Sequence, residues 1–300
     1  MGATLYTSAS PSILHSLRLR LTAYWSMIKD LQTGLLVITA AAGYISACCL
    51  NPASANLLHL TGSMFLAVSG STVLNMFFDR DIDARMPRTI WRPLPSGKIQ
   101  PYEAALLGML LSAAGLFWAA ILDWRYAAVT ALGLFLDVTV YTLWLKRRTP
   151  WSILIGGLSG GMPALAGRVL ALGRVDLIGI LFVAGILCWI PTHILTFSIK
   201  HRQDYALAGI PTFPASYGTS FTRKIIALST VLAVACLAGL GWHLMLPVIL
   251  RQGLLLLGGA LIALVAFSVV RPGRRLNFIL YKGASIFMLS AMILIIAGGL

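Results

Sequence analysis

The sequence predicts an all-α, polytopic membrane protein, and three observations favour this fold class. Of its 300 residues, 58% are hydrophobic and only 11% are charged, whereas soluble domains are about 45–50% apolar and about 25% charged. The mean hydropathy is +0.86. Long apolar runs also recur along the whole chain, which leaves little room for a separate soluble domain.

Nine apolar runs are long enough to cross a bilayer, because a crossing helix needs about 20 predominantly apolar residues. Basic segments follow the second, fourth, sixth and eighth runs and divide the series into pairs. In chain order, the predicted helices are 31–50, 57–78, 102–122, 124–145, 151–171, 176–199, 224–246, 253–270 and 278–299.

The charge balance predicts which side of the membrane each loop faces. The chain has 23 Lys and Arg against 9 Asp and Glu, a net charge of +14. In a soluble protein this excess would suggest nucleic acid, but cytoplasmic loops of membrane proteins are themselves rich in Lys and Arg. Nine alternating crossings leave only four basic residues on one side: Arg125, Arg168, Arg174 and Arg251. We therefore expect an integral, multi-pass protein of a prokaryotic cell membrane with a cytoplasmic N-terminus, an outer C-terminus and no nucleic-acid partner.

An unusual stripe of polar side chains lies at the end of the second predicted helix. Asn75, Asp79 and Asp83 are spaced i, i+4, i+8, so they drift by only about 40° per step on an α-helix and share one face. Asp81 points away from that face. Carboxylate and amide oxygens suit Mg²⁺, which typically bridges one or two carboxylates to substrate phosphates. The alternative is a solvated helix end whose Asp residues pair with Arg80, Arg85 and Arg88.

Two cytoplasmic loops, at about 79–101 and 200–223, are longer than the others and contain Pro and Gly. In the second loop, Asp204 is the acidic residue of the run 200–205, which does not favour a symmetric second metal site. Lys200 and Arg202 could neutralise phosphate oxygens directly. Each could equally be a loop charge that marks the cytoplasmic side.

These segments resemble the UbiA intramembrane prenyltransferase family. The run Asn75-x-x-x-Asp79-x-Asp81-x-Asp83, continued through 86–97, looks like its first aspartate motif. Within the family, 141–150 resembles the end of the fourth helix of the branch that farnesylates heme, and 189–193 with 204–211 resembles that branch's sixth helix and second motif. The resemblance covers nearly the whole chain, and it implies a single domain, 1–300, of about nine transmembrane helices around a central, lipid-accessible cavity.

The resemblance also implies a reaction and a set of site residues. Asn75, Asp79, Asp83 and Asp204 would hold Mg²⁺, and the three aspartates would be catalytic. The donor would be farnesyl diphosphate and the acceptor the vinyl group of heme B, giving heme O. The positions that match diphosphate-binding residues are Lys29, Arg88, Arg92, Lys146, Lys200 and Arg202.

Four further residues are candidates for the acceptor side. Asp137 lies four residues before Tyr141 on the fourth predicted helix, and an ionisable group inside the membrane is usually functional or paired. It could line the acceptor chamber or bond a neighbouring helix. Tyr141 and Trp189 offer ring faces that attract a cationic intermediate. His193 could approach heme or carry a proton, or be a hydrogen bonder between helices.

The sequence departs from the family pattern at two places. Asp30 and Leu31 follow Lys29 where the branch has Pro-Arg, and Thr192 replaces the second Pro of a Pro-Pro-His run. The alternatives are prenylation of another lipophilic acceptor, such as a quinone precursor or a lipid alcohol, and a transporter. The oligomeric state is left open.

Overall fold

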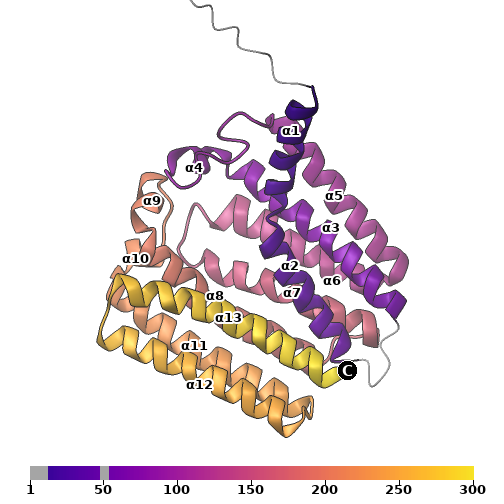
Figure 1. Ribbon diagram of the computed structural model, residues 1–300, viewed down its shortest axis with the longest axis vertical. Helices are drawn as coiled ribbons and strands as arrows, with labels where there is room; N and C mark the ends of the chain where they lie inside the picture. The colour runs from indigo at the N-terminus through magenta and orange to yellow at the C-terminus, as the bar shows by residue number, and fades with distance from the viewer. Residues whose placement is uncertain (1–12, 48–53) are drawn as a thin grey trace, which may run out of the picture.

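The computed structural model describes residues 13–47 and 54–300, and its regular elements are all helical. The first twelve residues, where the sequence predicts a cytoplasmic N-terminus, and 48–50, the end of the first predicted span, lie outside the described residues (Figure 1). The elements are α1 (Ile13–Ile28), α2 (Asp30–Ile45), α3 (Ser54–Phe78), α4 (Arg80–Arg85), α5 (Pro101–Leu122), α6 (Trp124–Leu134), the π-helix η1 (Phe135–Leu145), α7 (Ser152–Leu172), α8 (Leu177–Lys200), α9 (Arg202–Leu207), α10 (Phe213–Ser216), α11 (Gly218–His243), α12 (Val248–Val270) and α13 (Arg274–Gly299).

The predicted series of spanning helices is confirmed. In the described part of the chain, eight helices are long and apolar enough to cross a membrane, and the ninth predicted span is the shorter apolar helix Leu31–Ile45. Large apolar side chains cover their outer faces: Leu256 is 75% exposed and Phe117 is 70% exposed. Such faces are unfavourable in water but match a hydrocarbon solvent, so the outward leucines and phenylalanines belong in the bilayer.

Small residues allow the spanning helices to approach closely. A Cβ atom placed on Gly43 would lie 2.0 Å from the Ala164 carbonyl oxygen, and one placed on Gly167 would lie 2.0 Å from the Ala40 oxygen. Helices α2 and α7 therefore touch through their backbones at two glycines. Close approach of this kind favours helix association where lipid removes the hydrophobic driving force.

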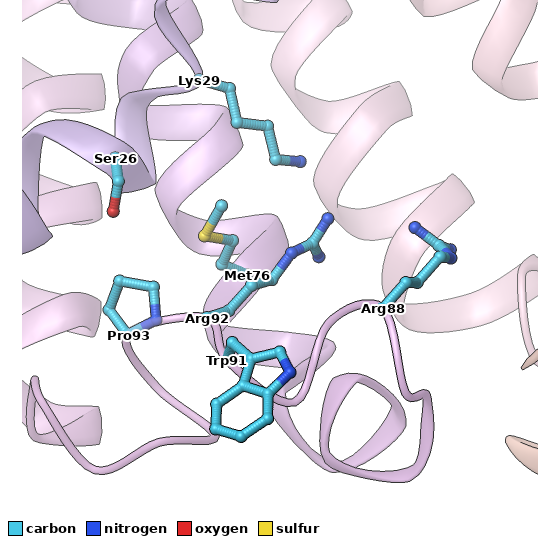
Figure 2. Close-up of a pocket in the computed structure, with 7 residues that line it drawn as sticks. All are labelled: Ser26, Lys29, Met76, Arg88, Trp91, Arg92 and Pro93. Carbon is cyan, nitrogen blue, oxygen red and sulfur yellow. The ribbon is translucent and has the colours of Figure 1, made fainter.

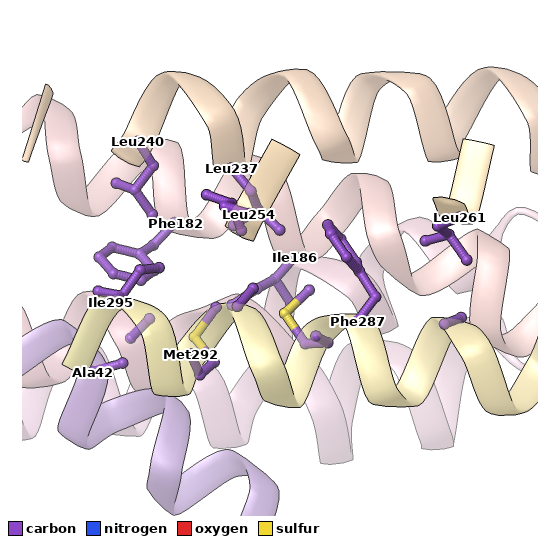
Figure 3. Packing of buried hydrophobic residues seen from close by; sticks show 14 of the residues in the cluster. Ala42, Phe182, Ile186, Leu237, Leu240, Leu254, Leu261, Phe287, Met292 and Ile295 are labelled. Atoms are coloured by element: carbon purple, nitrogen blue, oxygen red, sulfur yellow. The ribbon is translucent and has the colours of Figure 1, made fainter. Parts of the chain in front are cut away.

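The largest apolar core lies among α8, α11, α12 and α13 (Figure 3). Phe182 and Ile186 of α8 pack with Leu237 of α11, Leu254 of α12 and Met292 of α13. This packing fixes α13 beside α8, although the two helices are far apart in sequence. The short helices α4 and α9 lie at one end of the bundle, and the C-terminus lies at the other (Figure 1).

Candidate active site

The predicted polar stripe crosses the junction between α3 and α4. Asp79 interrupts the regular helix, yet its backbone N–H donates to the backbone carbonyl oxygen of Asn75 at 2.9 Å. The backbone N–H of Asp83 likewise donates to the backbone carbonyl oxygen of Asp79 at 2.8 Å. Helical bonding therefore continues across the break, as the i, i+4, i+8 spacing predicts. Asp79 is 7% exposed and Asp83 is 2% exposed, so the alternative of a solvated helix end does not describe these two carboxylates.

Asp79 is paired with Lys146, which directly follows η1. The Lys146 ammonium donates to Asp79 Oδ2. Burial by itself would lower the pKa of Lys146, but the charge and hydrogen bond of Asp79, together with Tyr141 and Tyr205, outweigh burial and hold the pKa above its usual range. The other oxygen, Asp79 Oδ1, is buried and accepts no hydrogen bond from the described residues. A buried carboxylate oxygen without a donor is costly unless a cation or donor approaches it.

Asp83 is held by Arg92 from the first long loop. Arg92 Nη1 lies 2.9 Å from Asp83 Oδ1 and 2.7 Å from Oδ2. The Thr89 hydroxyl donates to the Asp83 backbone oxygen at 2.9 Å and ties the same loop to α4. The loop is thereby folded back over the polar stripe.

Asp81 points away from the stripe, as the sequence predicts. Its carboxylate receives two hydrogen bonds of 2.7 Å from the Arg147 guanidinium, and Arg147 also donates to the Phe78 oxygen at 2.7 Å. Hydrogen bonding from Arg147 lowers the pKa of Asp81 below its usual range. This exposed pair connects α4 to the residue segment that follows η1.

The two long loops meet through Asp204 and Arg88. Arg88 Nε lies 3.5 Å from Asp204 Oδ2, and His201 Nδ1 lies 3.2 Å from the same oxygen. The Arg88 guanidinium also lies over the rings of Phe197 and Tyr205, 5.0 and 5.3 Å from their centroids. Beside this junction is a small apolar cluster of Ile82, Met86, Ala208 and Ile210.

Lys29, Arg88 and Arg92 converge on a pocket of about 400 Å³ at this end of the bundle (Figure 2). The other lining residues are Ser26, Met76, Trp91 and Pro93. Lys29 sits between α1 and α2 with a left-handed backbone, φ 52° and ψ 59°. Burial, followed by the nearby charges of Arg92 and Lys146, lowers the pKa of Lys29 to about 8. Three of the predicted diphosphate-binding residues therefore share one cavity.

The structure does not bring Lys200 and Arg202 to this pocket. Lys200 lies over the ring of Phe278 on α13, 4.8 Å from its centroid. Arg202 is exposed on α9. Both residues lie close to Asp204 in sequence, but Lys200 is the last residue of α8 and Arg202 is the first residue of α9. Their role as diphosphate ligands stays a prediction.

Asp137 faces α3, and Tyr141 packs on α7. Asp137 Oδ2 accepts from the Ser71 hydroxyl at 2.5 Å and from Asn75 Nδ2 at 2.8 Å. A Cβ on Gly156 would lie 3.4 Å from the Tyr141 ring, and Lys146 Nζ is 5.7 Å from that ring's centroid. Of the two interpretations of Asp137, the structure favours the hydrogen bond to a neighbouring helix.

A row of aromatic rings, formed by Trp189, His193, Tyr281 and Phe197, leads to Arg88. His193 stacks on Trp189 at 5.0 Å and on Tyr281 of α13 at 4.5 Å, and Phe197 lies 5.6 Å from Tyr281. His193 Nδ1 lies 3.1 Å from the Ser285 hydroxyl. Sequence reasoning identified Trp189 and His193 but missed Phe197, which the i+4 spacing on α8 could have revealed. It also missed Tyr281 and Ser285, because they lie on α13 and no sequence spacing on α8 indicates them.

The predicted metal ligands are not gathered around one point. Within the described ranges, no three His, Cys, Asp or Glu side chains lie close enough to hold a metal. Each of these aspartates is instead paired with a cation: Asp79 with Lys146, and Asp83 and Asp204 with Arg92 and Arg88 of the first long loop. The buried Asp79 Oδ1 nevertheless fits a divalent cation, because it is an anionic oxygen with an open lone pair beside a cationic pocket.

Known proteins support the same fold and family. The model of the UbiA prenyltransferase family matches residues 36–295. A protoheme IX farnesyltransferase of Korarchaeum cryptofilum is 41% identical, over 72% of this chain and 73% of the relative. One of Archaeoglobus fulgidus is 40% identical, over 76% and 79%.

A solved structure has the same architecture at low sequence identity. The UbiA homolog from Archaeoglobus fulgidus, bound to GPP and Mg²⁺, superimposes with a TM-score of 0.67 at 15% identity and covers 91% of this chain and 99% of that chain. At this identity the likeness concerns the fold alone. The family match over most of the chain, together with relatives at 40 and 41% identity, is decisive: the chain belongs to the UbiA prenyltransferase family.

Proposed function

We propose that this protein transfers the farnesyl group of farnesyl diphosphate to a vinyl group of heme B, giving heme O and diphosphate. The observation that carries the proposal is the pocket in which Lys29, Arg88 and Arg92 converge beside the buried Asp79 and Asp83. The two relatives named protoheme IX farnesyltransferase support this choice of substrates. A single domain, 1–300, would carry the activity.

The donor's diphosphate would bind in the cationic pocket. Arg88 and Arg92 each offer a planar fork of N–H donors that matches phosphate oxygens, and Lys29 adds a point charge. Lys146 lies at the edge of the polar stripe through its contact with Asp79. The isoprenoid tail is apolar and would extend along the spanning helices. The central cavity that would receive it stays a prediction.

Asn75, Asp79 and Asp83 would hold Mg²⁺, with Asp204 contributing from the second loop. When bound, Mg²⁺ supplies positive charge beside the diphosphate oxygens. Asp79 and Asp83 would then turn part of their oxygen contacts from Lys146 and Arg92 to the divalent cation. Lys146 and Arg92 would become free to bind the phosphate oxygens. The charge balance of the pocket is kept as the donor enters.

The acceptor would lie along the part of this aromatic row formed by Trp189, His193 and Tyr281, because a flat porphyrin packs well on aromatic faces. The C1–O bond of the donor breaks and its electron pair leaves with diphosphate. The allylic cation is then attacked by the vinyl carbon. Water adds to the resulting cation and loses a proton, which leaves a hydroxyethylfarnesyl substituent. Cationic residues stabilise the leaving group, and nearby rings stabilise the allylic cation.

The direct test uses purified protein with heme B, Mg²⁺ and farnesyl diphosphate. We expect heme O, identified by mass, together with released diphosphate. If heme O is absent and a phenolic acceptor is prenylated instead, the protein is a family member with another acceptor. Substrate flux across vesicles without diphosphate release would indicate a transporter. Trp189, His193 and Tyr281 offer flat, aromatic surroundings, which favours heme over a lipid alcohol.

Donor binding should weaken as the pH rises through about 8. Lys29 has a pKa of about 8, since burial and the charges of Arg92 and Lys146 outweigh the attraction of Asp79 and Asp137. Diphosphate prefers the protonated amine, so Lys29 contributes to binding below pH 8 and loses this contribution above it. We expect the KM for the donor to rise between about pH 7 and 9, by up to about tenfold per unit.

The matched variant is Lys29→Arg, whose guanidinium stays charged over this range. Ionisation of the substrates changes the KM of wild type and variant alike, so its effect cancels in the ratio of the two KM values. A ratio that stays constant from about pH 7 to 9 would contradict the assignment of Lys29 to the diphosphate site.

The pocket and both long loops would face the cytoplasm, with the C-terminus on the outer side of the cell membrane. This proposal follows from the distribution of Lys and Arg. Water-soluble farnesyl diphosphate head groups would then reach the pocket from the cytoplasm. Cysteine-accessibility labelling of Lys98→Cys in intact cells should show protection from an impermeant reagent.

A further inference from the structure

Two residues of η1 hold the Asn75 amide from both sides. Asn75 Nδ2 donates to Asp137 Oδ2 at 2.8 Å, and the Thr142 hydroxyl donates to Asn75 Oδ1 at 2.9 Å. The Ser71 hydroxyl, one turn before Asn75 on α3, donates to the same Asp137 oxygen at 2.5 Å. Both hydrogen-bonding groups of the Asn75 side chain are thus bound at this end of the bundle.

The π-helical conformation of η1 makes this arrangement possible. In an α-helix, residues five apart are separated by roughly 140° around the axis and do not share a face. In η1 the hydrogen bonds run between residues five apart, as from the Lys146 N–H to the Tyr141 oxygen at 2.8 Å. The Thr142 hydroxyl also lies 2.9 Å from the Asp137 backbone oxygen. Asp137 and Thr142 therefore face α3 together, and π-helical turns often occur at functional sites.

The chemistry of the Asn75–Asp137 pair fixes which way the Asn75 amide points. A carboxylate only accepts hydrogen bonds, so Asp137 requires the Nδ2 side of Asn75. The reversed amide would place Oδ1 against the Asp137 carboxylate and would turn Nδ2 towards Thr142. A carboxylate that accepts from the amide NH₂ group also increases the negative charge on Oδ1, which strengthens it as a ligand for a cation.

We propose that Asp137 is a positioning residue that orients and polarises the Asn75 amide for the divalent cation of the active site. The role rests on the proposed function, because it assumes that Asn75 contacts this cation. It replaces the expectation that Asp137 lines the acceptor chamber. Outer partners of metal ligands orient those ligands, and changing them typically costs about 10–100-fold in metal affinity.

The test measures Mn²⁺ affinity by electron paramagnetic resonance on the purified full chain in the presence of inorganic diphosphate. We expect Asp137→Asn to weaken Mn²⁺ binding about 10–100-fold, because an amide at position 137 can donate or accept and no longer requires one orientation of Asn75. The matched control is Asp123→Asn, which removes one acidic charge at the other end of the same span. Asp123 caps α6 by accepting from the Arg125 and Tyr126 N–H groups, and Asn can replace it there. The Mn²⁺ affinity of this control should stay within about twofold of wild type, since the substitution keeps the cap.

A double variant separates positioning from general damage. Asn75→Asp alone faces two carboxylates against each other and should weaken binding, whereas Asn75→Asp with Asp137→Asn restores an amide–carboxylate pair. We expect the double variant to bind Mn²⁺ more tightly than either single variant. Should Asp137→Asn fail to fold, the double variant carries the test, and weak binding there would overturn the proposal.

The outcomes distinguish this proposal from the proposed function. Equal Mn²⁺ affinity in wild type and Asp137→Asn overturns the positioning role and leaves the metal site intact. No Mn²⁺ binding by wild type overturns the metal site and the positioning role together. Failure of heme farnesylation with normal Mn²⁺ results would change the acceptor only.

Discussion

Replacing Asp79 by Asn is expected to reduce prenyl transfer by at least about a hundredfold while the protein still folds. The buried Oδ1 of Asp79 is an anionic oxygen without a hydrogen-bond donor among the described residues, and Oδ2 receives the Lys146 ammonium. The amide of Asn keeps the size of the side chain but removes the charge that a divalent cation requires. Loss of one preorganised charge at a reacting centre typically costs about 10²–10³-fold.

The measurement is the rate of diphosphate release with saturating donor, on protein that elutes as a single species in detergent. Lys146 can still donate to the amide oxygen of the Asp79→Asn side chain, so its packing at the end of η1 should persist. The Asp123→Asn variant serves again as the matched control, since Asp123 lies far along the same membrane span from Lys146. Near-normal turnover of Asp79→Asn would remove Asp79 from the proposed metal site.

Replacing Arg92 by Met is expected to destabilise the protein by about 3 kcal/mol and to abolish donor binding. Asp83 is 2% exposed, and Arg92 contacts both of its oxygens. Removing one partner of a buried ion pair leaves an uncompensated charge and costs about 3–5 kcal/mol. The lower figure applies here, because the Arg92 side chain is 31% exposed and water screens part of the interaction. Denaturant unfolding in mixed micelles gives the stability.

A second substitution separates stability from chemistry. Asp83→Asn in the Arg92→Met background removes the unpaired charge, so the unfolding free energy should recover by about 2 kcal/mol. Activity should not recover, since both a cation of the pocket and a carboxylate of the stripe are absent. Recovery of activity in the double variant would show that Arg92 acts only as the counter-ion of Asp83.

The polar stripe could be predicted because its geometry is local. Asn75, Asp79 and Asp83 lie within a few helical turns, and helical periodicity alone places them on one face. Their partners were not evident from the spacing. Asp79 pairs with a lysine 67 residues away, and Arg92 reaches Asp83 by a loop that folds back. Asp204, expected to contribute to the Mg²⁺ site from the second loop, contacts Arg88 of the first loop, and no cluster of three carboxylates forms among the described residues. Its role as a metal ligand stays a prediction.

Lys200 and Arg202 show what a motif match leaves undecided, and Asp137 shows the same for helical spacing. A match to a motif places a residue near a site in sequence, but the direction of its side chain depends on the helix that carries it. Lys200 is the last residue of α8 and lies over Phe278. Asp137 sits on a π-helix, where Thr142, five residues further on, faces α3 together with it. Sequence periodicity gave no indication of this change in helix type.

The sequence by itself determined the membrane-spanning helices, the polar stripe and the family. Each depends on composition or on a repeat within a few turns, and these are properties of the chain before it folds. Only the tertiary structure decided which cations face the stripe, that Asn75 is held by Asp137, and that Tyr281 and Ser285 surround His193. The Asn75–Asp137 and His193–Ser285 contacts join residues 62 and 92 positions apart, and the packing of whole helices brings them together.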